Sequence, residues 1–137
     1  MRWYELAENP QAISELYSDV PSLESVHLIE VSLHRDGTRM SLKVALPRFP
    51  DKPPARWKAQ GYNTVQVQLD FWTLQTILIN GWSTDNFVDI HILPDANKQI
   101  DLQIVSSHCS IEATAHDFRI TLHKFNLASM AKRGEHK

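Results

Sequence analysis

Short segments in which apolar and polar residues alternate are the feature of this sequence that most constrains its fold. In the segment 39–46 every second residue is apolar: Met40, Leu42, Val44 and Leu46. Successive side chains of a β-strand point to opposite faces, so this spacing predicts a strand with one buried face. The segments 26–28 and 29–33 alternate in opposite phase, which predicts a β-bulge near Ile29. Asp36-Gly37 between the two strands predicts a tight hairpin turn.

The rest of the chain predicts six more strands. They are expected at 65–71, 74–79, 87–93, 99–105, 109–115 and 118–122. The run 74–79 is mainly apolar, with Leu74 and then Ile77 to Ile79, so we expect it to be buried on both faces and to end at Asn80-Gly81. The proline-rich segment 47–57 cannot join a central strand, and we expect one helical turn after Pro53-Pro54.

One helix is expected near the N-terminus. Asn9 is a predicted N-cap and Pro10 the first helical residue, and three apolar residues then share one face: Ile13, Leu16 and Tyr17. The predicted fold class is therefore α+β and mainly β. One short N-terminal helix is expected to pack on an antiparallel sheet or β-sandwich of about eight strands.

Length and charge limit the organisation and the partners. The 137 residues fit one domain, which we place at residues 1–125, and the patternless charged segment 126–137 is expected to be a flexible tail. The formal net charge of −2 gives no support to nucleic-acid binding, which favours a basic face. No apolar run has signal-peptide length or the roughly 20 residues of a membrane span, so we expect no membrane partner and a cytoplasmic location.

Catalytic and metal-binding spacings are missing from the sequence. It contains no H-E-x-x-H, C-x-x-C or G-x-S-x-G motif, and its four glycines form no phosphate-binding loop. Cys109, the only cysteine, is in phase with Ile111, which predicts a buried thiol and not a nucleophile. We therefore predict no enzyme activity, metal or cofactor. A hydrolase or metal enzyme is the third alternative, built on Asp89, His91, His116 and His123.

The polar faces of the predicted strands supply the candidate binding residues. If these strands are neighbours, they form one mildly acidic, amide-rich surface that suits recognition of a protein, or that is only solvated. Tryptophans are enriched in binding hot spots, so Trp57 and Trp82, which lie beside predicted loops, are further candidates if they are exposed. The candidate partner-binding residues are Gln66, Gln68, Asp70, Asp89, His91, Asp101, Gln103, Trp57 and Trp82.

The order of several segments resembles one known family. These segments are, in order, Trp3, Asn9-Pro10, Ile13 to Tyr17, Val20-Pro21-Ser22-Leu23, the strands around Asp36-Gly37, Phe49 to Trp57 (FPDKPPARW), Val65 to Phe71 (VQVQLDF) and Gly81-Trp82. Over approximately Trp3 to Phe125 the chain resembles the Immunity protein 50 family, small bacterial proteins encoded beside polymorphic toxins.

The resemblance implies a function that the strand pattern does not. It implies an immunity protein of a polymorphic toxin system, a toxin inhibitor that acts by protein–protein interaction with a cognate toxin domain in the cytosol. It implies no catalytic residue, and it leaves the toxin and the oligomeric state open. The alternative is a β-sandwich module that binds a small ligand or carbohydrate through Trp57, Trp82 and the outer amides.

Overall fold

The computed structural model describes residues 2–53, 55–59, 61, 64–84, 87–97 and 99–125. The predicted tail 126–137 lies outside the described residues. The helical elements are η1 (Trp3–Leu6), α1 (Gln11–Ser14) and α2 (Ala55–Ala59). The strands are β1 (Val26–His34), β2 (Arg39–Ala45), β3 (Thr64–Trp72), β4 (Thr76–Asn80), β5 (Phe87–Pro94), β6 (Ile100–Val105), β7 (Ser110–Ala115) and β8 (Asp117–Phe125).

All eight strands form one open antiparallel sheet, in the order β4-β7-β6-β5-β1-β2-β3-β8. The predicted bulge is confirmed, because the register between β1 and β2 shifts between Leu28 and Glu30. The hairpin turn after β1 is also confirmed. Gly37 there has a φ of 88°, a left-handed conformation that glycine adopts without steric cost.

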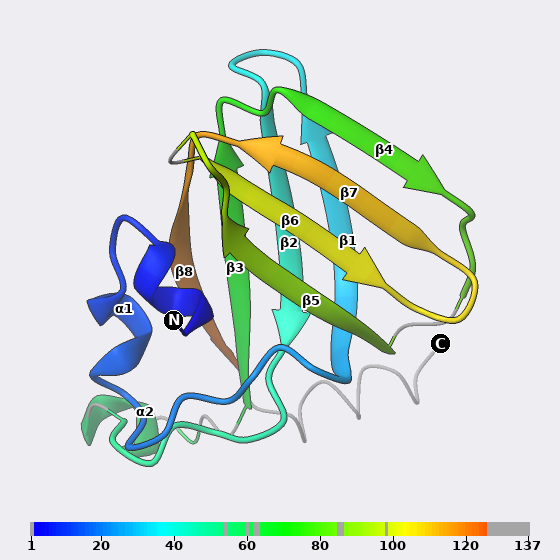
Figure 1. Cartoon of the computed structure of the whole chain (residues 1–137). Helices are drawn as coiled ribbons and strands as arrows, with labels where there is room; N and C mark the ends of the chain where they lie inside the picture. Colours follow the sequence, from blue (N-terminus) through cyan, green and yellow to red (C-terminus); the bar gives the residue numbers. More distant parts are fainter. Residues whose placement is uncertain are drawn as a thin grey trace.

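The sheet folds over on itself because its two halves are joined by a short pairing. Among the residues that the structure describes, β1 and β5 are in register only at Val26 with Val88 and at His27 with Phe87. In Figure 1 the half made of β4 to β7 lies in front of the half made of β1, β2, β3 and β8. The inward side chains of both halves form one core, in which the rings of Phe71 and Phe118 stack with centroids 5.1 Å apart. The chain is therefore mainly β, as predicted.

The N-terminal segment differs from the prediction. Its helical structure is reduced to a short 3-10 turn and the four-residue α1, and Asn9 makes no helix cap. Helix growth stops because the carbonyl of Leu16 accepts a hydrogen bond from the backbone N–H of Lys52 (2.9 Å), and the N–H of Ser18 donates to Asp51 Oδ1 (2.8 Å). Since η1 contacts β5 and α1 contacts β8, the segment covers one open side of the folded sheet (Figure 1).

The prediction that the run 74–79 is buried on both faces is wrong. The strand there is β4, which among the described strands pairs only with β7 and forms an edge of the sheet. An edge strand has a neighbour on one side only, so Leu78 remains 61% exposed and Ile79 is exposed as well. The described part of the chain contains no helix long and apolar enough to cross a membrane.

Candidate functional site

The structure divides the predicted binding residues between two surfaces. Gln66, Gln68 and Asp70 lie on β3, in the half with β1, β2 and β8. Asp89, His91, Asp101 and Gln103 lie on β5 and β6, in the other half. Because the inner faces of the halves pack on one core, their outer faces point away from each other. The condition for one continuous surface, that these strands are neighbours, is not met, and the candidate residues lie on two surfaces.

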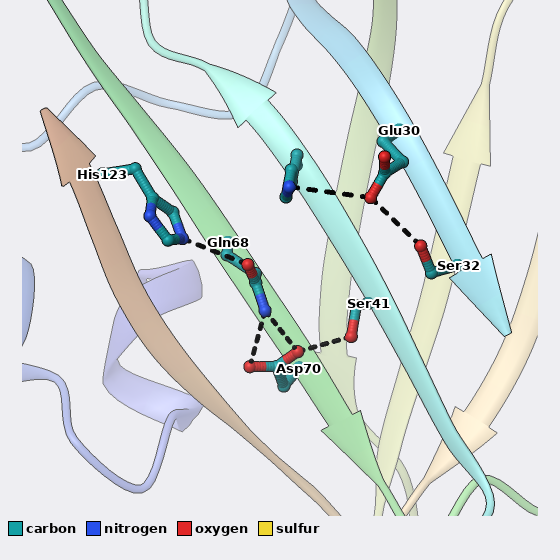
Figure 2. A network of polar contacts seen from close by, with 7 residues as sticks. Glu30, Ser32, Ser41, Gln68, Asp70 and His123 are labelled. Atoms are coloured by element: carbon teal, nitrogen blue, oxygen red, sulfur yellow. Dashed lines mark hydrogen bonds and ion pairs between the residues drawn. The ribbon is translucent and has the colours of Figure 1, made fainter. Parts of the chain in front are cut away.

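Polar groups on the first surface are joined mainly to one another. Asp70 is only 9% exposed; its Oδ1 accepts hydrogen bonds from Ser41 Oγ (2.5 Å) and from Gln68 Nε2 (3.0 Å). The chain continues from Gln68 Oε1 to His123 Nε2 at 3.1 Å. Figure 2 shows this network across neighbouring strands. A buried carboxylate whose two oxygens both accept hydrogen bonds from neighbouring side chains is a structural group.

The second surface, the outer face of β4, β5, β6 and β7, has a regular layout. We call it the β4–β7 outer face, and the strand register arranges its side chains in three rows that run across the strands. The rows are Asp89–Val105–Ser110–Asn80, His91–Gln103–Glu112–Leu78 and Leu93–Asp101–Thr114–Thr76. Direct cross-strand neighbours have Cβ atoms about 5 Å apart, so side chains in a row touch.

The charge on the β4–β7 outer face is of one sign. Its strands contain the carboxylates of Asp89, Asp101 and Glu112 and no lysine or arginine. Asp89 Oδ1 accepts a hydrogen bond from the N–H of Ser25 (2.7 Å), whereas no salt bridge or side-chain hydrogen bond reaches Asp101 or Glu112 from the described residues. The nearest cation along the chain, Lys98, lies outside those residues.

Apolar side chains are exposed on the same face. Leu78, Leu93 and Val105 are 61%, 52% and 45% exposed. A hollow of about 340 Å³ lies beside Leu78, between Asp101 and Glu112. These apolar residues were missed as site residues. For Leu93 and Val105 strand phase was a usable signal, because both are out of phase with the inward residues of β5 and β6. Together these side chains leave apolar surface on this face, which a protein partner would remove from water.

The two tryptophans named as candidates have opposite environments. Trp57 is 6% exposed and packs edge-on against Phe49, whereas Trp82 is 69% exposed in the loop after β4. Trp82 stands at a second cavity of about 340 Å³, where β1 diverges from β5. The cavity has a mixed lining, in which Val88, Ile104 and Ile111 of β5 to β7 are apolar and Glu30, Thr84 and Ser106 are polar.

The residues of the metal-enzyme alternative are not assembled into a site. Asp89 and His91 lie on β5, His116 lies between β7 and β8, and His123 is joined to Gln68. No group of three or more histidine, cysteine, aspartate or glutamate residues in the described ranges could hold a metal ion. Cys109 is half-buried at the wall of the Trp82 cavity.

The carboxyl groups of Glu8 and Asp117 interact, and their pKa values are shifted in opposite directions. Burial, and then the hydrogen bond and the charge of Glu8, raise the pKa of Asp117. The hydrogen bond from Asp117, followed by that from Arg119, lowers the pKa of Glu8. Arg119 Nη1 also lies 3.2 Å from Glu8 Oε2. These contacts hold the N-terminal segment at the edge of the sheet, away from the β4–β7 outer face.

The chain thus presents an open, mainly β sheet with one partly apolar outer face whose strands contain no lysine or arginine. The sequence model of the Immunity protein 50 family matches residues 9–125, and the chain belongs to this family. Membership implies toxin immunity with a toxin as partner, and it suggests a role other than enzyme catalysis. No curated protein and no solved structure matches the chain.

Proposed function

We propose that this protein is an immunity protein that binds a cognate toxin domain in the cytosol and neutralises it by covering its surface. The observation that carries the proposal is the family match over residues 9–125, which spans every strand of the sheet. The exposed aliphatic side chains of the β4–β7 outer face support it, because a partner that covers them removes apolar surface from water.

The sheet suits tight binding for a physical reason. Side chains on strands are held by the hydrogen-bonded backbone of their neighbours, so binding orders few residues and its entropic cost is small. A standard interface covers about 800 Å² of each partner and reaches nanomolar affinity when a few central side chains are well packed. An inhibitor of this kind acts stoichiometrically and needs no catalytic group of its own.

Growth rescue with the toxin domain encoded beside the gene tests the proposal. Expression of that domain in the cytosol should stop growth, and co-expression of the immunity protein without any export signal should restore it. Size-exclusion chromatography of the co-expressed pair should give a stable complex. Absence of both rescue and complex contradicts the proposed function. Rescue that depends on exporting the protein contradicts the cytosolic location.

The Trp82 cavity favours a second candidate function, the binding of a small apolar or carbohydrate ligand. Trp82 is exposed at its mouth, and stacking on an exposed indole is a common mode of ligand recognition. The test is the change in tryptophan fluorescence of the purified protein with a panel of sugars and apolar ligands. A change that disappears in Trp82→Phe supports this candidate, and an unchanged spectrum with every ligand counts against it.

A further inference from the structure

Charge balance distinguishes the two outer faces of the sheet. On the face of β1, β2, β3 and β8 charges of both signs are present, and Lys43 Nζ lies 3.7 Å from Glu30 Oε2. On the β4–β7 outer face three carboxylates stand without a lysine or arginine on the same strands. A surface with one sign of charge attracts a partner of the opposite sign and repels others, which favours one orientation of docking.

The rows of the β4–β7 outer face pair each carboxylate with an aliphatic side chain. Asp89 is directly opposite Val105, and Asp101 is directly opposite Leu93. Glu112 is directly opposite Leu78 on the edge strand. Lysine and arginine are amphipathic in the same way, with an apolar stem and a charged head. A carboxylate beside an exposed aliphatic group therefore matches the stem and the head of one basic side chain.

We infer that the β4–β7 outer face is the surface that receives the toxin, and that the toxin presents a basic patch to it. This inference rests on the proposed function. Lysine or arginine side chains of the toxin lie with their methylene groups on Leu78, Leu93 or Val105 and their charged heads at the neighbouring carboxylate. The hollow between Asp101 and Glu112 gives such a side chain room at the centre of the face.

The dimensions of the face agree with a central role in the interface. Four strands at about 4.8 Å spacing and about six residues at 3.3 Å per residue cover roughly 20 Å by 20 Å. This is smaller than the footprint of a standard interface, about 800 Å² of surface per partner. The face accordingly supplies the centre of the contact, and adjoining loops supply the rim.

Neutralising two carboxylates without changing their shape tests the charge. The variant Asp101→Asn/Glu112→Gln removes two negative charges from the face. Its matched control, Glu15→Gln/Asp36→Asn, removes two charges at exposed sites outside the four strands. Association and dissociation rates with the toxin domain are measured at about 0.1 M and about 1 M salt, between which the Debye length falls from about 10 Å to about 3 Å.

We expect the face variant to associate at least about ten-fold more slowly at low salt, with the difference from wild type shrinking at high salt. The control variant should stay within about two-fold of wild type. Truncation of an anchor, Leu78→Ala, should speed dissociation about ten-fold, whereas Leu33→Ala, which truncates a 50% exposed leucine on β1, should not. Unchanged melting temperatures show that all four variants are folded.

The outcomes separate this inference from the proposed function. If wild type binds the toxin and the face variants bind it equally well, the inference is overturned while the immunity function stands. If the control variants lose affinity and the face variants do not, the toxin docks elsewhere and the inference is again overturned. If wild type does not bind the toxin at all, the proposed function fails and the docking face fails with it.

Discussion

Asn9 holds the N-terminal segment to the exposed edge of β8, and its replacement is expected to destabilise the whole fold. Its side-chain amide makes two hydrogen bonds with the backbone of Ile120. Asn9 Nδ2 donates to the carbonyl of Ile120 at 2.8 Å, and the N–H of Ile120 donates to Asn9 Oδ1 at 2.8 Å. Next to them the N–H of Glu8 donates to the carbonyl of Phe118 at 2.9 Å. The side chain thus pairs with β8 as a neighbouring strand would.

The substitution Asn9→Ser distinguishes this role from helix capping. Serine caps helices about as well as asparagine, so a cap would survive the change with little loss. Serine is too short to make both hydrogen bonds with Ile120, and each lost bond costs about 1 kcal/mol. The expected loss is about 2 kcal/mol. With an unfolding entropy of about 2.1 cal/mol/K per residue, a chain of 137 residues should then melt about 7 °C lower.

Urea unfolding followed by circular dichroism measures the free energy of unfolding, and thermal melting gives the second value. Asn9→Ala should lose about as much stability as Asn9→Ser, because neither side chain can pair with Ile120 on both sides. A serine variant within about 0.5 kcal/mol of wild type, with alanine about 1 kcal/mol worse, would fit a helix cap and refute the pairing role.

Two further changes are expected to alter stability in defined directions. Gly81→Ala places a Cβ 2.2 Å from the carbonyl oxygen of His108 at a φ of 82°. It should therefore lower the free energy of unfolding by well over the roughly 1 kcal/mol expected for a control substitution at another glycine of positive φ. The control, Gly37→Ala, has a φ of 88° but no atom within 4 Å of the new Cβ, and urea titration measures both. Asp117→Asn removes a carboxyl whose pKa is raised by burial and by Glu8. The raised pKa stabilises folded wild type fully only below about pH 4, the ordinary pKa of aspartate, and this contribution is lost as the pH rises through the folded-state pKa. The stability of Asp117→Asn relative to wild type should therefore increase as the pH rises above about 4. A stability difference between Asp117→Asn and wild type that does not depend on pH would contradict the effect.

Much of the sheet could be predicted from strand phase alone. The bulge near Ile29, the turn at Asp36-Gly37 and the outward positions of Asp89, His91, Asp101 and Gln103 on their strands all agree with the structure. These features are local, because whether a side chain points inward depends on its position along its own strand. Local signals were misleading where a distant partner intervened. The helix expected after Asn9 is cut short where Lys52, remote in sequence, binds the carbonyl of Leu16, and its cap is lost because Ile120 binds the side chain of Asn9.

The candidate site was predictable only in part. Asp89, His91, Asp101 and Gln103 are brought onto one face, while Gln68 and Asp70 belong to an internal network on the other. The sequence pattern showed that all six are on polar faces of strands. It could not show which strands are neighbours, and so it joined two surfaces that point in opposite directions.

The sequence by itself determined the strand phases, the mainly β class and membership of the immunity family. The tertiary structure decided which strands form an edge, which polar groups are already occupied and which face carries charge of one sign. The physical reason is that strand order is a non-local property: it depends on pairing between segments far apart in the chain. Leu78 illustrates the difference, because the same apolar run would be buried in the centre of the sheet and is exposed at its edge.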